Sequence, residues 1–458
     1  MRTITDPQHL AADHGAMAGP FLTLALDRTR AATLTRRFEL TDIDRVEVGR
    51  GASDGAVRER RLVRISVADP AMSEHHVVLE RNAGAWIATD AGSKNGTLVD
   101  GARPTGDPIA DGAVIEAGRC FFVFRRAAPG DAGPLELRLD DLPLRPDGLA
   151  TFHPGLARRL AVAERIAGSR VPVLLLGETG TGKEVVTQAL HAVSGRTGDL
   201  VAVNCGALPG NLLESTLFGY RKGAFSGATE DRPGLIRAAH RGTLFLDEIG
   251  ELSPAGQVAL LRVLETGEVL PIGETRPVAV DVRIVAATLR DLRVAAATGT
   301  FRGDLLARLS GHVVETMPLR ARREDLGLVL ARLCASERLR WPEGVSLSRA
   351  AAQLLFTHEW PHNVRELVHA FDAALVIGPQ RGELAAEAFE GALAMTPAGA
   401  PPAPTTRPVA PDGEEARLRE LLATHAGNLS AVARALATSR TQVVRLLARY
   451  RIDLAAYR

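Results

Sequence analysis

The stretch GETGTGKE at residues 177–184 has residue types and spacing suited to holding phosphate groups. It fits the pattern G-x-x-x-x-G-K, in which glycines let backbone N–H groups curl around phosphates and the lysine, Lys183, reaches the β and γ oxygens. The apolar run VPVLLL precedes it and a helical run follows it. Glu184 replaces the usual serine or threonine, so the usual hydroxyl ligand to Mg²⁺ is missing. We expect phosphate contacts from Gly177, Glu178, Thr179, Gly180, Thr181, Gly182, Lys183 and Glu184.

A second stretch, GTLFLDEIGE at residues 242–251, supplies an acidic pair directly after an apolar strand. Ligands in open α/β sheets lie at the carboxyl ends of strands, which is where Asp247 and Glu248 fall. We expect Asp247 to hold Mg²⁺ through water and Glu248 to orient or polarise an attacking water molecule. A surface acidic pair is usually only solvated charge, but here it accompanies a phosphate loop. The two stretches together predict hydrolysis of ATP with Mg²⁺.

The loop RKGAFSGATED at residues 221–231 places a large apolar ring, Phe225, between small residues and two glycines, Gly223 and Gly227. Burial of a phenylalanine side chain is worth roughly 1.5–3 kcal/mol, yet these neighbours build no helix or strand that could hold the ring inside. Two readings remain open. The ring is an apolar contact carried on a mobile arm, or it belongs to a surface turn and packs back onto the core.

The C-terminal stretch between Asn428 and Arg451 contains five arginines and no acidic residue. Such a local basic patch fits contact with DNA phosphates and the major groove, although a solvated basic helix would have the same composition. Apolar residues from Val443 to Tyr450 recur at i, i+3, i+4 and i+7, which predicts a buried helix face, and Ser439 is a plausible N-cap. We expect DNA contacts from Arg440, Thr441, Gln442 and Arg445.

Three kinds of sequence pattern follow one another along the chain and predict the elements that position these residues. Residues 20–127 hold short alternating strands: in RLVRISVAD the apolar residues Val63, Ile65 and Val67 fall on one face. Turn signals recur every ten or so residues, which favours an all-β sandwich. In residues 145–320, apolar strands alternate with helical stretches, the pattern of a parallel sheet with crossover helices. Residues 321–395 are mostly helical, 396–412 form a Pro- and Ala-rich linker, and 413–458 are helical again.

Composition limits the classes of function. The 458 residues suggest about three domains at ~100–200 residues each, and the net charge of +1 means that any nucleic-acid contact comes from a local patch. Cys120, Cys205 and Cys334 lie far apart without metal-ligand spacing, as expected of buried thiols in a reducing cytosol. No apolar run approaches the ~20 residues of a membrane span, and no signal peptide is evident. We therefore expect a cytoplasmic protein.

Residues 150–393 resemble the AAA+ domain of bacterial enhancer-binding proteins, the activators of sigma-54 RNA polymerase. GETGTGKE is that family's version of the phosphate loop, and LFGYRKGAFSGA resembles its signature LFGHEKGAFTGA. GTLFLDEIGEL, FRGDLLARL and WPHNVREL match three further blocks in the family's order. The resemblance implies an ATPase that works as a hexamer on the sigma-54 RNA polymerase holoenzyme. It also implies that the loop touches sigma-54 through Gly223, Ala224, Phe225, Ser226, Gly227 and Ala228.

The same resemblance assigns roles to single residues. Asn204 matches an asparagine that switches Glu248 between resting and catalytic poses. Arg302 and Arg308 match arginines that reach a neighbouring subunit's nucleotide, and Arg365 matches the sensor arginine of the helical lid. The sequence departs from the family's pattern at three positions, none of which removes a catalytic group: Ser226 for threonine, Leu289 for asparagine and His362 for glycine.

The N-terminal part resembles the forkhead-associated (FHA) domain, through RVEVGRGASD, MSEHHVVL and AGSKNGTLVDG. The family uses these blocks to bind phosphothreonine in a partner protein or kinase. The resemblance implies that Arg50 and Ser73 contact the phosphate and that Asn95 bonds the peptide backbone. Glu74 and Lys94 depart from the residues common beside the phosphate, and Glu74 would repel it. A purely structural or intramolecular role for this domain is the alternative.

The C-terminus resembles the Fis-type helix-turn-helix that ends this activator family, with Ala437 at the position of the usual turn glycine. The leading interpretation is a transcription activator with an FHA sensor, an ATP-driven remodelling domain and an anchor to upstream, enhancer-like DNA. A phosphopeptide-binding scaffold with a decayed ATPase is a second class, and another AAA+ machine such as an unfoldase or helicase loader is a third.

Overall fold

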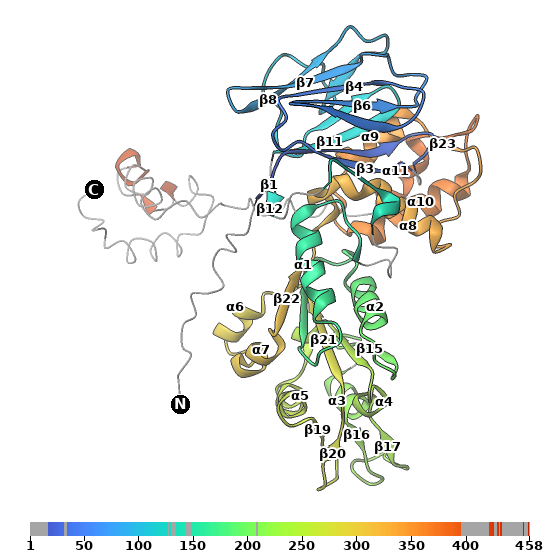
Figure 1. Ribbon diagram of the computed structural model, residues 1–458. Helices are drawn as coiled ribbons and strands as arrows, with labels where there is room; N and C mark the ends of the chain where they lie inside the picture. Colours follow the sequence, from blue (N-terminus) through green and yellow to red (C-terminus); the bar gives the residue numbers. More distant parts are fainter. Residues whose placement is uncertain are drawn as a thin grey trace. The chain divides into compact units, whose positions relative to one another are not determined.

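Two β-sheets, antiparallel except for the parallel pair of β4 and β6, form a β-sandwich in the N-terminal part of the protein (Figure 1). The chain divides into two compact units, Met1–Met395 and Thr396–Arg458. The computed structural model describes residues 17–394 apart from 32–33, 127, 130–133, 143–148 and 208, and in the second unit residues 421–425, 428, 429, 431, 432, 452 and 457.

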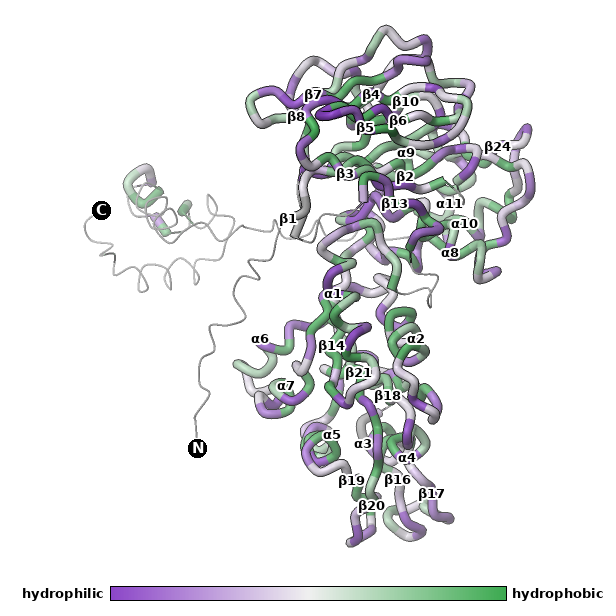
Figure 2. The backbone as a smooth tube through the Cα atoms, viewed as in Figure 1, coloured by the Kyte–Doolittle hydropathy of each residue, from purple (hydrophilic) through white to green (hydrophobic). Residues whose placement is uncertain are grey.

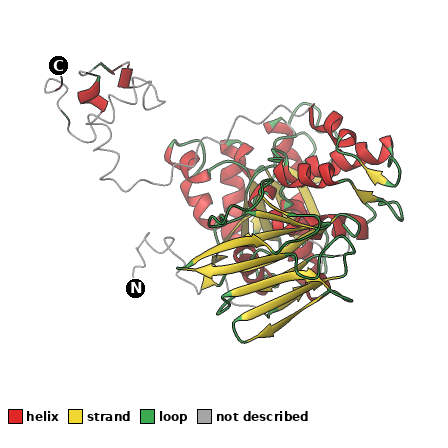
Figure 3. Cartoon of the chain, turned by 90° about the horizontal axis from the view of Figure 1, so that it is seen from above, coloured by secondary structure: helices red, strands yellow, loops and turns green. Residues whose placement is uncertain are grey.

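The sandwich consists of a six-stranded sheet in the order β13-β3-β2-β11-β10-β9 and a five-stranded sheet in the order β5-β6-β4-β7-β8. Figure 3 shows these strands in yellow. A short pair, β1 and β12, lies outside both sheets. The bounds are β1 Met17–Ala18, β2 Phe21–Asp27, β3 Arg36–Glu39, β4 Arg45–Arg50, β5 Gly55–Glu59, β6 Leu62–Val67, β7 Val77–Asn82, β8 Ala85–Asp90, β9 Thr97–Val99, β10 Val114–Ala117, β11 Cys120–Arg125, β12 Ala128–Pro129 and β13 Glu136–Arg138.

The alternation read from the sequence is confirmed in β6. Val63, Ile65 and Val67 are buried in the core between the two sheets, while Arg64 is exposed. Strands β7 and β8 form a hairpin, and its turn places Ala83 and Gly84 at φ +48° and +85°. An all-β sandwich is therefore the fold of this part of the chain.

The α/β domain has a five-stranded, fully parallel sheet in the order β15-β18-β21-β14-β22. Its central strands are apolar on both faces because helices cover both sides, and Figure 2 shows this apolar colouring along β14 and β21. The bounds are β14 Val173–Leu176, β15 Leu200–Asn204, β18 Thr243–Asp247, β21 Arg283–Thr288 and β22 His312–Glu315.

Helices and small hairpins complete the first unit. The α/β domain contains α1 Pro154–Arg165, α2 Lys183–Val193, α3 Gly210–Phe218, α4 Leu235–Ala238, α5 Pro254–Thr266, α6 Leu292–Ala297 and α7 Gly303–Leu309, with hairpin strands β16 Gly219–Tyr220, β17 Arg232–Pro233, β19 Glu268–Val269 and β20 Val278–Ala279. The helical lid contains α8 Leu326–Ala335, α9 Arg349–Thr357, α10 Asn363–Ile377 and α11 Glu387–Ala394, with strands β23 Ser346–Leu347 and β24 Glu383–Leu384. Among the described residues, no helix combines the length and apolarity needed to cross a membrane.

The outer face of the six-stranded sheet packs against the lid. One apolar cluster joins Ala25, Phe121 and Val123 of the sandwich to Leu330 and Phe356 of the lid. The rings of Phe121 and Phe356 stack with their centroids 5.1 Å apart. Strands β2 and β11 are therefore buried on both faces, which explains why β11 reads as an unbroken apolar run and β6 does not.

Charged pairs flank this apolar contact. Arg125 of β11 donates to both carboxylate oxygens of the buried Glu324, at 3.1 and 2.8 Å. Glu116 of β10 accepts from Arg349 and from Gln353, the latter at 2.9 Å. These pairs satisfy charges that the interface takes out of water, so they fix how the two surfaces fit together.

Asp325, next to Glu324, is a fully buried carboxylate at the foot of the lid. It accepts from the Thr151 hydroxyl at 2.6 Å and from the Phe152 N–H at 2.7 Å, so it ties the lid to the chain that enters α1. Burial raises the pKa of Asp325 from 3.8 to about 6, and the nearby Arg322 only partly opposes this.

We expect this carboxylate to make stability fall as pH rises from 4 to 6. The folded pKa of Asp325 lies above the unfolded value, so its contribution is complete below about pH 4 and is lost as pH rises through about 6. Two pKa units correspond to about 3 kcal/mol. Relative to Asp325→Asn, whose amide stays neutral, the wild-type midpoint of thermal unfolding should fall across this range and then level off. Asp372→Asn, at an exposed position, is the control; a pH-independent gap for Asp325→Asn contradicts the expectation.

Candidate functional site

The carboxyl ends of the parallel strands bring the predicted nucleotide residues to one edge of the sheet. The phosphate loop follows β14, while β15 ends at Asn204 and β18 ends at Asp247. A cavity of about 780 Å³ lies at this edge. Of the predicted residues, its wall contains Thr179, Gly180, Thr181, Gly182, Lys183, Glu184, Asn204, Asp247, Glu248 and Arg365, whereas Gly177 and Glu178 lie outside the wall.

Glycine is required in the phosphate loop by both backbone conformation and space. Gly180 has φ +77°, and a Cβ there would lie 2.1 Å from the carbonyl oxygen of His362 in the lid. Gly182 has φ +99° and is the N-cap of α2, so the helix begins directly at Lys183. The loop thus presents the N-terminus of α2 to the cavity, which is a favourable position for an anion.

Lys183 is the buried cation of the cavity. Its Nζ donates to the carbonyl oxygens of Gly177 at 2.8 Å and Glu178 at 3.1 Å. Burial lowers the pKa of Lys183, and the carboxylates of Glu248 and Asp247 partly offset this effect. An ammonium group held among carbonyls beside a helix N-terminus is suited to phosphate oxygens.

The acidic pair is held in a strained turn after β18. Glu248 has φ +51°, and its carboxylate accepts from the backbone N–H of Leu289 at 3.3 Å. The side-chain oxygen of Asn204 accepts from the Gly206 N–H at 2.9 Å. The side chains of Glu248 and Asn204 are thus each hydrogen-bonded to a different backbone N–H. Because Leu289 acts through its N–H, the departure of its side chain from the family's asparagine leaves this contact in place.

Two lid residues that the sequence reasoning did not single out tie the lid to the phosphate loop. Arg320 forms a bidentate ion pair with Glu178. The fully buried Asn363 donates to Glu178 at 3.1 Å and to the Thr179 carbonyl at 3.0 Å, and it accepts from Leu319 at 2.7 Å. Arg320 is the main cause of the lowered pKa of Glu178. The only sequence signal for this contact is the position of Asn363 within WPHNVREL.

The rest of the cavity wall combines aliphatic and basic side chains. Leu156 and Leu160 of α1 and Val329 and Leu333 of α8 belong to it, and so does Arg322, which donates to the Thr181 carbonyl at 3.0 Å. A cavity with a phosphate loop and aliphatic side chains in its wall fits a nucleotide, whose phosphates would meet the loop and whose base would meet aliphatic side chains.

Arg302 and Arg308 do not belong to the wall of this cavity. The Arg302 guanidinium pairs with Asp304 at 2.7 and 3.0 Å, and Arg308 lies 3.7 Å from Glu265. Both side chains are about half exposed or more. The chain therefore does not bring these arginines to its own nucleotide cavity.

The loop after β16 carries Phe225 on the surface. Its ring is 40% exposed and meets the edge of Tyr220 at 5.0 Å, and it belongs to none of the apolar clusters of the described residues. Gly223 and Gly227 have φ +82° and +111°, and an added Cβ on either would meet nothing within 4 Å. The positive φ angles thus account for glycine at both positions, since no close neighbour excludes a side chain there.

A second loop, between β19 and β20, supports the first one. The Ile272 N–H donates to the Gly219 carbonyl at 2.9 Å, and the Arg221 N–H donates to the Ile272 carbonyl at 3.0 Å. A Cβ on Gly273 would lie 2.8 Å from the side chain of Ala224. No motif in the sequence marks this contact, and the two hairpins lie side by side at the lower end of the α/β domain in Figure 1.

In the sandwich, the three predicted phosphopeptide residues lie at the end of β4, for Arg50, and on two loops, for Ser73 and Asn95. Arg50 is exposed, and its N–H donates to the Ser73 carbonyl at 2.8 Å. Asn95, also exposed, donates from its side chain to the Ala71 carbonyl at 2.7 Å. The buried His76 bridges the Ser73 N–H and the Gly96 carbonyl at 3.0 and 3.1 Å, which holds the loops together. The DNA-contact residues predicted from the sequence, Arg440, Thr441, Gln442 and Arg445, lie outside the described residues.

Comparisons with known proteins agree with this architecture. Residues 46–118 match the FHA domain, residues 149–315 match the Sigma-54 interaction domain, and residues 320–404 match an AAA+ ATPase lid domain. The chain is similar to the anaerobic nitric oxide reductase transcription regulator NorR of Aeromonas hydrophila, at 37% identity over 94% of this chain and 90% of that protein. NorR of Salmonella typhimurium is 42% identical over 70% of this chain and 65% of that protein.

A solved structure of NtrX from Brucella abortus in complex with ATP is 28% identical, covering 66% of this chain and 68% of that chain with a TM-score of 0.47. At that score the likeness adds no conclusion about fold or function. The relative from Aeromonas, by contrast, is similar along nearly its whole length, and the domain matches agree with it. The chain therefore belongs to the family of AAA+ sigma-54-dependent transcriptional activators.

Proposed function

We propose that this AAA+ ATPase uses ATP hydrolysis to remodel the closed promoter complex of sigma-54 RNA polymerase through the loop that carries Phe225. The observation that carries the proposal is an exposed aromatic ring between two glycines whose Cα positions face open space, in a domain whose phosphate loop lines a cavity. Phe225 is the one aromatic residue among the exposed large hydrophobic residues of the part of the chain that the structure describes. The glycines Gly223 and Gly227 allow the loop to change its position.

In the proposed catalytic step, Lys183 binds the β and γ oxygens and Glu248 orients the attacking water. Lys183 exchanges its carbonyl partners for phosphate, and Glu248 is released from the Leu289 N–H, with Asn204 as its alternative partner. Asp247 and Glu184 supply carboxylates on the cavity wall, which fits Mg²⁺ held by one or two carboxylates together with phosphates. Bound Mg²⁺ would offset the negative charge of the phosphates.

A ring of subunits, hexameric as the family implies, would complete the site. Arg302 and Arg308 are exposed and away from the chain's own cavity, which supports a role at a neighbour's nucleotide. A guanidinium there stabilises charge on the transferring phosphoryl group. Arg365, which is on the wall, would report the nucleotide state to the lid.

The two ends of the chain supply control and location in this proposal. Arg50, Ser73 and Asn95 would hold a phosphothreonine of a partner protein or kinase, since hydroxyl, amide and guanidinium donors suit a dianion. The arginine-rich C-terminal stretch would anchor the protein at enhancer-like upstream DNA. We place the protein in the cytoplasm, where RNA polymerase and chromosomal DNA are accessible.

Arg302→Ala should lower ATP turnover by on the order of 10³-fold while leaving nucleotide binding nearly unchanged, because the residue acts on a neighbour's phosphates. Lys183→Ala should also abolish turnover, but through its own site. Mixing the two inactive variants should restore activity, since a Lys183→Ala subunit still provides Arg302. Steady-state ATPase assays over a range of mixing ratios measure this, with the exposed Arg237→Ala as control. No recovery at any ratio would contradict the trans geometry.

Arg50→Ala should weaken binding of a phosphothreonine peptide to the full chain at least tenfold, about 1.4 kcal/mol. Calorimetry with phosphorylated and unphosphorylated forms of peptides from a library measures the difference. Arg58→Ala, an exposed arginine on β5, should bind like the wild type. If the wild type bound both forms equally, phosphothreonine recognition would be refuted.

Phe225→Ala should abolish sigma-54 binding in the presence of an ATP transition-state mimic, together with open-complex formation. The ATPase rate and the hexamer should persist within a few-fold, because the exposed ring contributes little to the core. Phe225→Tyr keeps the ring and should retain part of the function. Leu212→Ala removes a similarly exposed apolar side chain on α3 and should behave like the wild type.

The alternative, in which the Phe225 ring packs back onto the core, predicts the opposite result. A ring packed into the core would cost about 3–5 kcal/mol on truncation to alanine and would disable the ATPase itself. Thermal melting and ATPase rate of the purified Phe225→Ala protein separate the two cases. A large loss in both measurements would rule out the contact arm.

A further inference from the structure

Helix α8 of the lid touches the sandwich and the nucleotide cavity at the same time. Leu326 and Leu330 are fully buried in the cluster shared with the sandwich. A Cβ on Gly327 would lie only 2.4 Å from the Ala25 carbonyl oxygen of β2, so the two backbones meet directly. Val329 and Leu333 line the nucleotide cavity. A shift of α8 at the nucleotide would therefore also shift the surface on which β2 rests.

The turn that follows β2 is bonded to the lid on its other side. The Arg28 guanidinium donates to the Leu347 carbonyl at 3.0 Å, and the Leu347 N–H donates back to the Arg28 carbonyl at 2.9 Å. Ala31 of the same turn lies in the shared apolar cluster. This turn is consequently held by the lid at several points.

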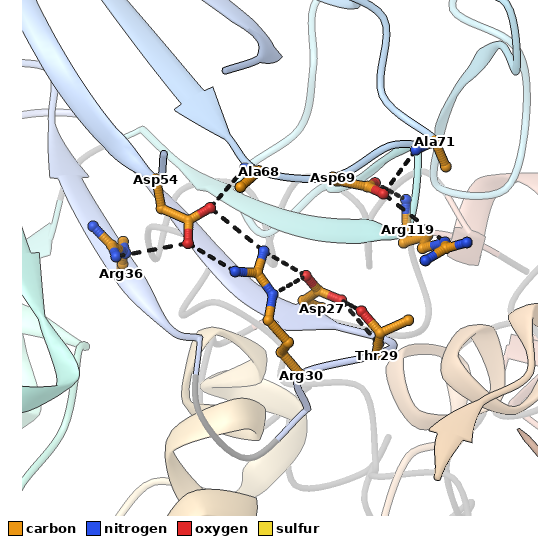
Figure 4. A network of polar contacts seen from close by, with 9 residues as sticks. All are labelled: Asp27, Thr29, Arg30, Arg36, Asp54, Ala68, Asp69, Ala71 and Arg119. Atoms are coloured by element: carbon orange, nitrogen blue, oxygen red, sulfur yellow. Dashed lines mark hydrogen bonds and ion pairs between the residues drawn. The ribbon is translucent and has the colours of Figure 1, made fainter. Parts of the chain in front are cut away.

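A network of charged groups leads from that turn to the part of the sandwich that carries the candidate phosphopeptide residues (Figure 4). Arg30 donates to Asp27 at 2.9 Å and to both oxygens of Asp54 at 2.8 and 3.4 Å. Asp54 also accepts from the Ala68 N–H at 2.7 Å and lies in the connection from β4, which ends at Arg50, to β5. The side chains of Asp27 and Asp54 are 2% and 14% exposed, so the contacts are shielded from solvent screening.

A second branch reaches the other predicted phosphate contact. The Arg28 N–H donates to the Arg119 carbonyl at 3.0 Å, and the Arg119 N–H donates to Asp69 at 2.7 Å. Asp69, itself buried, accepts from the Ala71 N–H at 2.9 Å. Ala71 precedes Ser73 by two residues and binds the side chain of Asn95, so both branches end at the loops that carry the candidate phosphopeptide residues.

We propose that the sandwich and the lid change position together. In this proposal Arg30 is a positioning residue that couples the phosphopeptide loops to the nucleotide cavity. This rests on the proposed function of both sites. A ligand at either site biases the position of α8 and the β2 turn, and linkage requires each ligand to change the affinity of the other by the same factor. The sign of the effect depends on which lid position each ligand favours.

Hydrogen–deuterium exchange on the full chain, with and without ADP as the probe, tests the coupling. ADP should change the exchange rates of peptides covering residues 50–54 and 66–73 at least twofold, together with the expected protection of residues 177–184. In Arg30→Ala the change at 50–54 should be lost, while the protection at 177–184 remains. Arg30 is one-third exposed, so the variant should fold, and its melting curve checks this.

Arg28→Ala serves as a second coupling variant, and Arg61→Ala is the matched control. Arg61 forms an Arg–Asp pair with Asp44 in the turns before β6 and β4, neither residue belongs to the network, and the loss of the pair should leave the ADP response intact. Protection of 177–184 with no change in the sandwich loops, or the same change in Arg30→Ala and Arg28→Ala as in the wild type, would refute the coupling and leave the ATPase untouched. No protection of 177–184 would refute the nucleotide site itself, and the coupling with it.

Discussion

Five parallel strands end at a single edge of one sheet, and the rest of the molecule depends on that constraint. Lys183, Asn204, Asp247 and Glu248 are spread over more than sixty residues of sequence, yet each follows or ends a strand and therefore meets the others at this edge. Along the chain, the hairpin that carries Phe225 lies between β15 and β18, and the hairpin that supports it lies between β18 and β21. Whatever moves the residues at the edge thus has a short covalent route to those hairpins.

The second constraint is the contact between the lid and the phosphate loop at the edge of the sheet. Polar groups of the lid make this contact, in addition to apolar packing. Asn363 and Arg320 bind the phosphate loop directly, and the carbonyl of His362 occupies the space that a side chain on Gly180 would need. The same lid offers its opposite surface to the β-sandwich. One helical body consequently lines the nucleotide cavity and also packs against the N-terminal domain.

Local patterns predicted the fold class, the strand faces and the phosphate loop, since glycine spacing, alternation and apolar runs are properties of neighbouring residues. The contacts of Arg30 with Asp54, of Arg125 with Glu324 and of Asn363 with Glu178 join residues from 24 to 199 positions apart, and nothing in their surroundings marks them as partners. The unbroken apolar run of β11 was the one visible sign that the sandwich is covered on its outer face. The domain boundaries and the roles of single site residues stay predictions.

The shared core of sandwich and lid also bears on how such proteins can be assembled from parts. Phe356 and Leu330 of the lid share one buried cluster with Phe121 and Val123 of the sandwich, and β13, which follows the FHA match, completes the edge of the sheet by pairing with β3. Exchanging the N-terminal domain for an unrelated domain would open this core to water and leave Glu324 without Arg125. A replacement domain would therefore need a lid surface that matches it.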